Sequence, residues 1–209
     1  MPTAAESATS TPPAEPERDA RRAAILDAAA RLIAERGYHA VRVADIAREV
    51  GTSTGAVHYY FPGKNDVLTA ALRSAVDRAF ERQSAELRRL DDAHARLLRL
   101  IEMQLPKVGV VRDEWSVWMQ FWAEATINPE LRPVHNAFYA RWHDTIARIV
   151  RRGQRQGTFS ADVDPDEVAV RLSALTDGLA IQVLTGAPGI TVTVMREVLV
   201  AFVRRELSV

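Results

Sequence analysis

The residues best suited to binding chemistry form one short polar run after Gly51. Hydroxyl, imidazole and phenol side chains alternate there with a glycine, in the order Thr52, Ser53, Thr54, Gly55, His58 and Tyr59, and Lys64 follows a Pro62-Gly63 break. Hydroxyls and free backbone N–H groups at the start of a helix bind phosphate, because that end of the helix is partly positive. Gly55 lets a backbone approach closely, while Tyr59 and Lys64 can donate to successive phosphates. The run therefore predicts contact with nucleic acid.

The sequence contains few of the residue patterns that enzymes use for catalysis. The sequence has no cysteine, no His-Glu-x-x-His, no Gly-x-Ser-x-Gly and no phosphate-cradling glycine loop, and its five histidines lack ligand spacing. We expect no catalytic residues, no metal and no cofactor. An all-α enzyme built on a carboxylate pair in the larger domain remains the rival from another functional class.

The elements that carry the polar run are short helices. Apolar residues recur with helical period from residue 20 onward, so the chain reads as all-α. A first helix is expected over 19–36, a second over 43–50 and a third over 54–61, with Gly37, Gly51 and Pro62 ending them in turn. Two short helices joined by a glycine-containing turn are typical of a helix-turn-helix.

Longer helices follow, separated by glycine and proline. The expected ranges are 65–89, 93–105, 112–126, 130–153, 165–185 and 190–207, which makes nine helices in all. Residues 1–18 are rich in proline and small polar residues and are expected to be a disordered tail. The predicted organisation is this tail, a helix-turn-helix domain over 19–64 and a larger helical domain over 65–209 that binds an effector and dimerises.

The order of residues in the N-terminal domain resembles a known family. It runs Gly37-Tyr38, Asp45-Ile46-Ala47, Gly51, Ser53-Thr54-Gly55, Tyr59-Tyr60-Phe61 and Lys64-Asn65. Over residues 25–72 this arrangement resembles the TetR family of bacterial transcriptional regulators, and it looks closest to the betaine-synthesis repressor subgroup. The resemblance places DNA contacts at Ser53, Thr54, Gly55, Tyr59 and Lys64.

Two positions depart from the family pattern. His58 stands where many members have tyrosine, and Arg42 stands where many have a hydroxyl residue that caps the second helix. Arg42 could instead reach a phosphate or a guanine edge. Two roles are open for Tyr60: it contacts DNA, or it packs against Pro62 or the following helix and supports the fold.

The larger domain contains an unusually aromatic stripe. Trp115, Trp118 and Trp122 are spaced on one helical face beside Glu114, and Phe138 and Trp142 lie on the next expected helix. Such a stripe can simply be core. The sharper hypothesis is a pocket for a small hydrophobic or cationic effector, with cation–π attraction to tryptophan and with Glu114 or Glu124 as counter-charge.

The last two helices carry more apolar surface than one intramolecular core needs. We expect the same pair from a second subunit to cover it, giving a homodimer whose two heads address a palindromic operator. No run of about 18 apolar residues and no signal peptide is evident, so a cytoplasmic protein without a membrane segment is expected.

These features together predict a ligand-responsive transcriptional regulator that binds operator DNA as a dimer. A repressor released by its effector is the leading hypothesis, with the helix starting near residue 65 as the lever. Enhancement of DNA binding by the effector is the opposite possibility. A constitutive DNA-binding protein without an effector is the remaining alternative.

Overall fold

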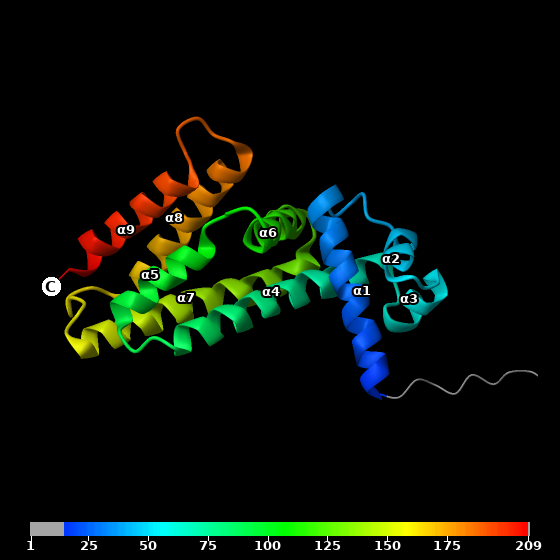
Figure 1. Ribbon diagram of the computed structural model, residues 1–209, viewed down its shortest axis with the longest axis horizontal. Helices are drawn as coiled ribbons and strands as arrows, with labels where there is room; N and C mark the ends of the chain where they lie inside the picture. The colour runs from blue at the N-terminus through cyan, green and yellow to red at the C-terminus, as the bar shows by residue number, and fades with distance from the viewer. Residues whose placement is uncertain (1–14, 209) are drawn as a thin grey trace, which may run out of the picture.

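The computed structural model describes residues 15–208, and this part of the chain is entirely helical (Figure 1). Nine α-helices and one 3-10 turn are present within it. Their bounds are α1 Glu15–Arg36, α2 Val43–Val50, α3 Thr54–Tyr60, α4 Lys64–Arg88, α5 Ala93–Gln104, α6 Val110–Ile127, η1 Pro129–Leu131, α7 Arg132–Gln156, α8 Pro165–Thr185 and α9 Val192–Leu207. The all-α prediction and the number of helices are confirmed.

Two helix ends differ from expectation by three residues or more. Helix α1 begins at Glu15, so residues 15–18 of the expected tail are helical, and residues 1–14 lie outside the described part. Helix α7 continues through Gly153 to Gln156 and ends at Gly157, which has φ 70°. Gly153 is a packing residue rather than a stop signal, because a Cβ there would lie 2.0 Å from the Phe159 ring.

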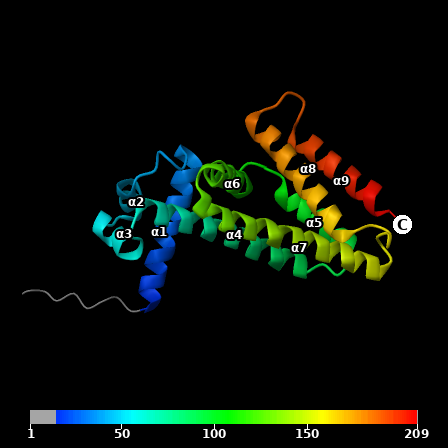
Figure 2. The same cartoon turned by 180° about the vertical axis from the view of Figure 1, so that it is seen from behind.

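The first three helices form a small head at one end of the molecule (Figures 1 and 2). Its centre is apolar and buried, with Ile25, Ile33, Val41, Ile46 and Val57 all fully enclosed. Helix α4 leaves this head and packs its first half against α1 through Val67, Leu68, Ala71 and Leu72. One long helix therefore belongs to both parts of the molecule.

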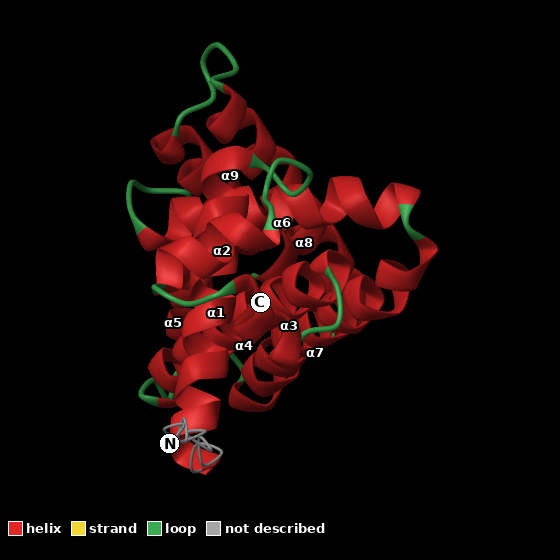
Figure 3. Cartoon of the chain, turned by 90° about the vertical axis from the view of Figure 1, so that its right-hand side faces the viewer, coloured by secondary structure: helices red, strands yellow, loops and turns green. Residues whose placement is uncertain are grey.

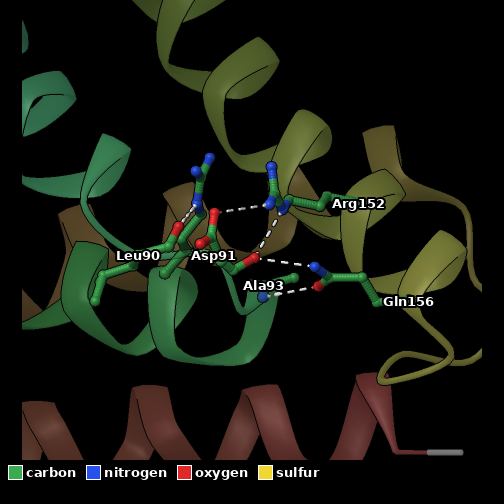
Figure 4. A network of polar contacts seen from close by, with 6 residues as sticks. Leu90, Asp91, Ala93, Arg152 and Gln156 are labelled. Atoms are coloured by element: carbon green, nitrogen blue, oxygen red, sulfur yellow. Dashed lines mark hydrogen bonds and ion pairs between the residues drawn. The ribbon is translucent and has the colours of Figure 1, made fainter.

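Helices α5 to α9 build the body around the second half of α4. Helix α7 packs against α8 and α5, and α8 packs against α9 at one outer edge of the body (Figure 1). Figure 3 shows that the described chain consists of helices joined by loops. The corner between α4 and α5 is tied to α7 by polar contacts to the Asp91 carbonyl, which accepts from Arg152 Nε and Gln156 Nε2 at 2.9 Å each (Figure 4). These bonds fix the end of α4 that is remote from the head.

The buried residues form two apolar clusters. One joins the head to the first half of α4 and the C-terminal half of α6, and the other fills the body between α5, α7, α8 and α9. Trp118 and Trp142 are partly buried and pack against both clusters. The two tryptophans therefore mark the boundary between the two cores.

Candidate nucleic-acid interface and ligand pocket

The turn between α2 and α3 follows from two local features. Gly51 adopts a left-handed conformation with φ 71°, which suits glycine and ends α2. Ser53 Oγ then accepts from the Ala56 N–H at 3.1 Å and caps α3. Val57 and Phe61 are buried in the head, so the other side of α3 faces outward.

The side chains predicted to meet DNA lie on that outward side. Ser53, Thr54, Gly55 and His58 are exposed, Thr52 is partly exposed, and Tyr59 is 66% exposed although it is a large aromatic residue. We call Thr52 to Tyr59, without the inward Ala56 and Val57, the recognition surface. Its exposure leaves the predicted contacts available to a bound duplex.

Gly55 has no internal reason to be glycine. A Cβ at this position would meet nothing closer than Ser53 Oγ at 3.7 Å, an ordinary contact, and its φ is not positive. A helix normally gains stability when glycine is replaced by alanine. The contacts within the chain therefore do not require glycine at this position.

Arg42, Lys64 and Tyr60 have different surroundings. The Arg42 side chain is exposed, and its backbone N–H donates to Asp45 Oδ2 at 3.2 Å at the start of α2. Lys64 Nζ donates to the His39 carbonyl at 2.8 Å, so one of its three hydrogens already holds the turn before α2. Tyr60 packs against the head core, which favours the structural reading of that residue.

A cavity of about 100 Å³ opens in the body between α4, α5, α6, α7 and α8. We call it the aromatic pocket. Of the residues predicted to line it, Glu114, Trp115, Trp118, Phe138 and Trp142 do so. Sequence reasoning missed the contributions of Phe80 and Gln83 from α4 and of Thr176 and Asp177 from α8.

Two predicted residues are placed elsewhere. Trp122 does not line the pocket but lies behind it, where its ring stacks on Tyr139 with centroids 6.4 Å apart. Glu124, one of the two expected counter-charges, turns toward the head instead. Trp122 shares a helical face with Trp115 and Trp118, but at its position this face packs against Tyr139 of α7 and not against the cavity.

The charges in the aromatic pocket are unequal. Glu114 receives two hydrogen bonds from Arg82, at 2.6 and 2.7 Å, and is therefore already neutralised. Asp177 receives one hydrogen bond, from Tyr139 Oη to Oδ2 at 2.7 Å. Burial raises the pKa of the Asp177 carboxyl to about 6, and the bond from Tyr139 opposes this rise. Burial and the nearby Asp177 charge raise the pKa of Tyr139, so that its phenol stays protonated.

One signal in the sequence pointed to Asp177. It is a lone acid in the middle of an otherwise apolar stretch of α8, next to Gly178. A charged residue at such a position is costly unless something pairs with it. The partner could not be read from the chain, because Tyr139 is 38 positions away on another helix.

The head is joined to the body by a second set of contacts. His39 Nε2 lies 3.0 Å from Glu124 Oε2, and the Tyr38 N–H donates to Gln120 Oε1 at 3.4 Å. Both partners belong to the C-terminal half of α6, and residues of the N-terminal half of the same helix line the aromatic pocket. Helix α6 therefore contacts the pocket and the turn that precedes α2.

These features define a class of protein. A helix-turn-helix head with an outward polar helix, joined to a helical body with an internal pocket, is the architecture of a one-component transcriptional regulator. Residues 25–79 match the family described as bacterial regulatory proteins, tetR family, and residues 93–208 match the BetI-type transcriptional repressor C-terminal domain. The chain belongs to the TetR family of transcriptional regulators and carries a BetI-type C-terminal domain, which confirms a regulator over an enzyme.

Individual relatives agree with this assignment. The HTH-type transcriptional regulator BetI of Cronobacter sakazakii is 28% identical over 192 residues, covering 90% of this chain and 91% of that protein. A transcriptional regulator from Saccharomonospora viridis, solved in complex with choline, is 55% identical with a TM-score of 0.84, covering 91% of this chain and 98% of that chain. A TetR-family regulator from Rhodococcus sp. is 31% identical with a TM-score of 0.80, covering 91% and 100%.

Proposed function

We propose that this protein is a dimeric, cytoplasmic repressor that binds a palindromic operator through the recognition surface and releases it when a small quaternary ammonium compound such as choline enters the aromatic pocket. The observation that carries the proposal is the pocket itself, which is lined by tryptophan, phenylalanine and tyrosine rings and contains one carboxylate without a cationic partner. Aromatic faces and a carboxylate attract quaternary ammonium groups. The choline complex of the 55% identical regulator supports the same ligand class.

DNA binding rests on the exposed polar side of α3 and its flanking residues. Thr52, Ser53, Thr54 and Tyr59 offer hydroxyl hydrogens, and Ser53 keeps its own hydrogen because its oxygen is the capping acceptor. Arg42 and Lys64 flank this surface and offer positive charge, and His58 offers a ring nitrogen. Phosphate contacts of this kind position a recognition helix, while side chains on its outer face read base edges.

Dimerisation rests on the outer side of α8 and α9. Val170 is 53% exposed and Val198 is 39% exposed, and a Cβ on Gly178 would meet nothing within 4 Å. Helix α8 is long and apolar enough to cross a membrane by length and composition alone, a test that core helices also pass. A second copy of the α8 and α9 pair would cover this apolar surface and supply the second head.

Coupling rests on the position of the aromatic pocket at the boundary between the two cores. A ligand there contacts α4 and α6, and both helices continue to the head. A ligand releases DNA only if it binds more tightly to the conformation with wrongly spaced heads. A coupling free energy of about 1 to 3 kcal/mol is typical of such systems.

The test has three stages with purified full-length protein. Bound fragments selected from random DNA should contain an inverted repeat, and sedimentation should show a dimer that Val198→Glu dissociates. Choline should then lower affinity for the selected fragment. Binding of DNA without any response to choline or tetramethylammonium would favour the constitutive binder, and tighter binding with choline would reverse the sign of regulation.

A further inference from the structure

The aromatic pocket contains two carboxylates in different electrostatic states. Glu114 on α6 is held by both terminal nitrogens of Arg82 on α4, so this pair carries no net charge. Asp177 on α8 has only the neutral phenol of Tyr139 as a partner. Within residues 15–208, no arginine, lysine or histidine forms an ion pair with Asp177. The pocket therefore has one carboxylate available to a ligand.

The remaining lining favours a cation that donates no hydrogen bonds. Trp115, Trp118, Phe138 and Trp142 present rings, and the polar lining beside the two carboxylates and Tyr139 is limited to Gln83, Gln104 and Thr176, whose hydroxyl donates to the Leu172 carbonyl at 2.8 Å. A primary ammonium would need several acceptors to replace its hydration. A quaternary ammonium has no N–H to satisfy and gains from ring faces and from a carboxylate nearby.

The same arrangement opposes a ligand that carries its own carboxylate. Such a group would enter a low-dielectric space that already holds the Asp177 carboxylate. Two guanidinium groups contact residues of the lining, and both are already paired: Arg82 with Glu114 through both terminal nitrogens, and Arg141, which lies over the Phe80 ring, with Asp77. The carboxylate of a zwitterion would have to compete with these pairs before it could be neutralised.

We propose that Asp177, positioned by Tyr139, is the counter-charge for the bound cation, and that the unshared carboxylate makes the aromatic pocket selective for a quaternary ammonium monocation over its zwitterionic analogue. This inference rests on the proposed function, because it specifies the ligand of the same pocket. Asp177 thus takes the role of counter-charge that the sequence had suggested for Glu114 or Glu124. Tyr139 is a positioning residue whose hydrogen bond stabilises the charged form of Asp177.

Titration calorimetry on the full-length protein tests this assignment with three probes. Choline and tetramethylammonium are monocations, and trimethylglycine carries a carboxylate in place of the hydroxymethyl group of choline. The wild type should bind both monocations, and trimethylglycine at least about tenfold more weakly. Asp177→Asn should weaken both monocations at least about tenfold while choline and trimethylglycine come closer in affinity.

Three further variants complete the test. Glu114→Gln frees Arg82 and should improve trimethylglycine binding more than it weakens choline binding. Asp144→Asn makes the same chemical change at an exposed carboxylate of α7 and should leave all three affinities unchanged. Tyr139→Phe should move the pH at which choline binding is half lost to a higher value, an effect that a purely structural role would not produce. Thermal unfolding of each variant confirms that it is folded.

The outcomes distinguish the two proposals. One outcome would overturn the counter-charge assignment and leave the proposed function intact. In it the wild type and Asp177→Asn bind choline equally well, whereas Glu114→Gln does not bind it. Equal affinity of the wild type for choline and trimethylglycine would overturn the selectivity. A wild type that binds DNA but neither monocation would overturn the proposed effector class itself.

Discussion

The imidazole of His39 reaches across from the head to Glu124, with Nε2 3.0 Å from Oε2. The Glu124 side chain is only 11% exposed, whereas the His39 side chain is 77% exposed. The carboxylate is thus fixed within the body, and the head approaches it from outside. The same His39 residue accepts the Lys64 hydrogen bond through its carbonyl, so this turn is attached to both α6 and α4.

We predict that His39→Ala weakens communication between the pocket and the head without changing either binding site. Choline affinity in the absence of DNA should stay at its wild-type value. The ratio of operator affinities without and with choline should fall by at least about threefold, because one contact between α6 and the head is lost from a coupling of about 1 to 3 kcal/mol. Fluorescence anisotropy with labelled operator measures this ratio.

Glu49→Gln provides the control for His39→Ala. It breaks an exposed head ion pair between Arg31 and Glu49, at 3.3 Å, that makes no contact with the body. Exposed pairs contribute little to stability. A His39→Ala protein with the wild-type ratio would remove this contact from the coupling route.

Tyr59 and Lys64 should affect DNA binding in different ways. Tyr59→Phe removes one exposed hydroxyl and should cost about 1.5 kcal/mol, or roughly tenfold in affinity, for operator and unrelated DNA alike. Lys64→Ala should also reduce the slope of log affinity against log salt by about one per head. Titrations at several salt concentrations compare the slopes, and an unchanged slope in Lys64→Ala would limit that residue to holding the His39 carbonyl.

Gly55→Ala separates the stability of the head from its fit to DNA. The open space around Gly55 and the higher helix propensity of alanine predict an unfolding free energy equal to or greater than that of the wild type. Operator affinity should nevertheless fall, because the added methyl group lies where a DNA backbone approaches. Denaturant unfolding and operator titration measure the two effects, and undiminished DNA binding would contradict the role assigned to Gly55.

Gly153→Ala should have the opposite effect on stability. The new Cβ would lie 2.0 Å from the buried Phe159 ring, and relief of this overlap should cost about 1 to 3 kcal/mol despite the gain in helix propensity. Gly55→Ala is the matched control, since its added Cβ would meet nothing closer than Ser53 Oγ at 3.7 Å. Urea unfolding should rank Gly153→Ala well below the wild type, and a stabilised Gly153→Ala protein would show that Phe159 moves aside freely.

Asp177 should make the ligand-free protein less stable as the pH rises. Its pKa is 3.8 as a free side chain and about 6 in the fold, so the folded state holds a proton that the unfolded state has already lost between these values. The stability from this proton is complete below the lower value and is lost as the pH passes the higher one. Asp177→Asn should therefore be more stable than the wild type by about 3 kcal/mol near pH 7, with the difference vanishing near pH 4.

Other titrating groups around Asp177 do not reverse this sign. Tyr139 on α7 stays protonated, and Glu114 on α6 is paired with Arg82 on α4. His143, next to Tyr139 on α7, has its pKa lowered by burial and stays neutral near pH 7. Unfolding of both proteins at three pH values provides the measurement, with excess choline expected to narrow the difference near pH 7. A constant difference at all pH values would show that Asp177 keeps its ordinary pKa.

The helices themselves were largely predictable because local signals set them. Gly51 ends α2 and the Pro62-Gly63 break follows α3, and Ser53 caps α3 through a bond to Ala56 three residues along the chain. The outward side of α3 followed from the spacing of Val57 and Phe61. These interactions span only a few residues, so the sequence contains both partners side by side.

The composition of the aromatic pocket was only partly predictable because it depends on how helices cross. Trp115, Trp118 and Trp122 share a helical face, but the angle between α6 and α7 leaves Trp122 behind the cavity wall. The bond between Tyr139 and Asp177 joins two helices whose relative rotation is set by the whole body. Periodicity identifies the face that a residue occupies, whereas its neighbour across the interface is a property of the assembled fold.

The two halves of α6 carry separate tasks, and this separation has an evolutionary consequence. Residues in its first half, such as Glu114 and Trp115, line the aromatic pocket, while Gln120 and Glu124 in its second half contact the head. Substitutions in the first half of α6 can change which ligand fits the pocket, while the second half keeps its contacts with the DNA-binding head. A lineage with this helix can acquire new chemical signals without having to rebuild the output that they control.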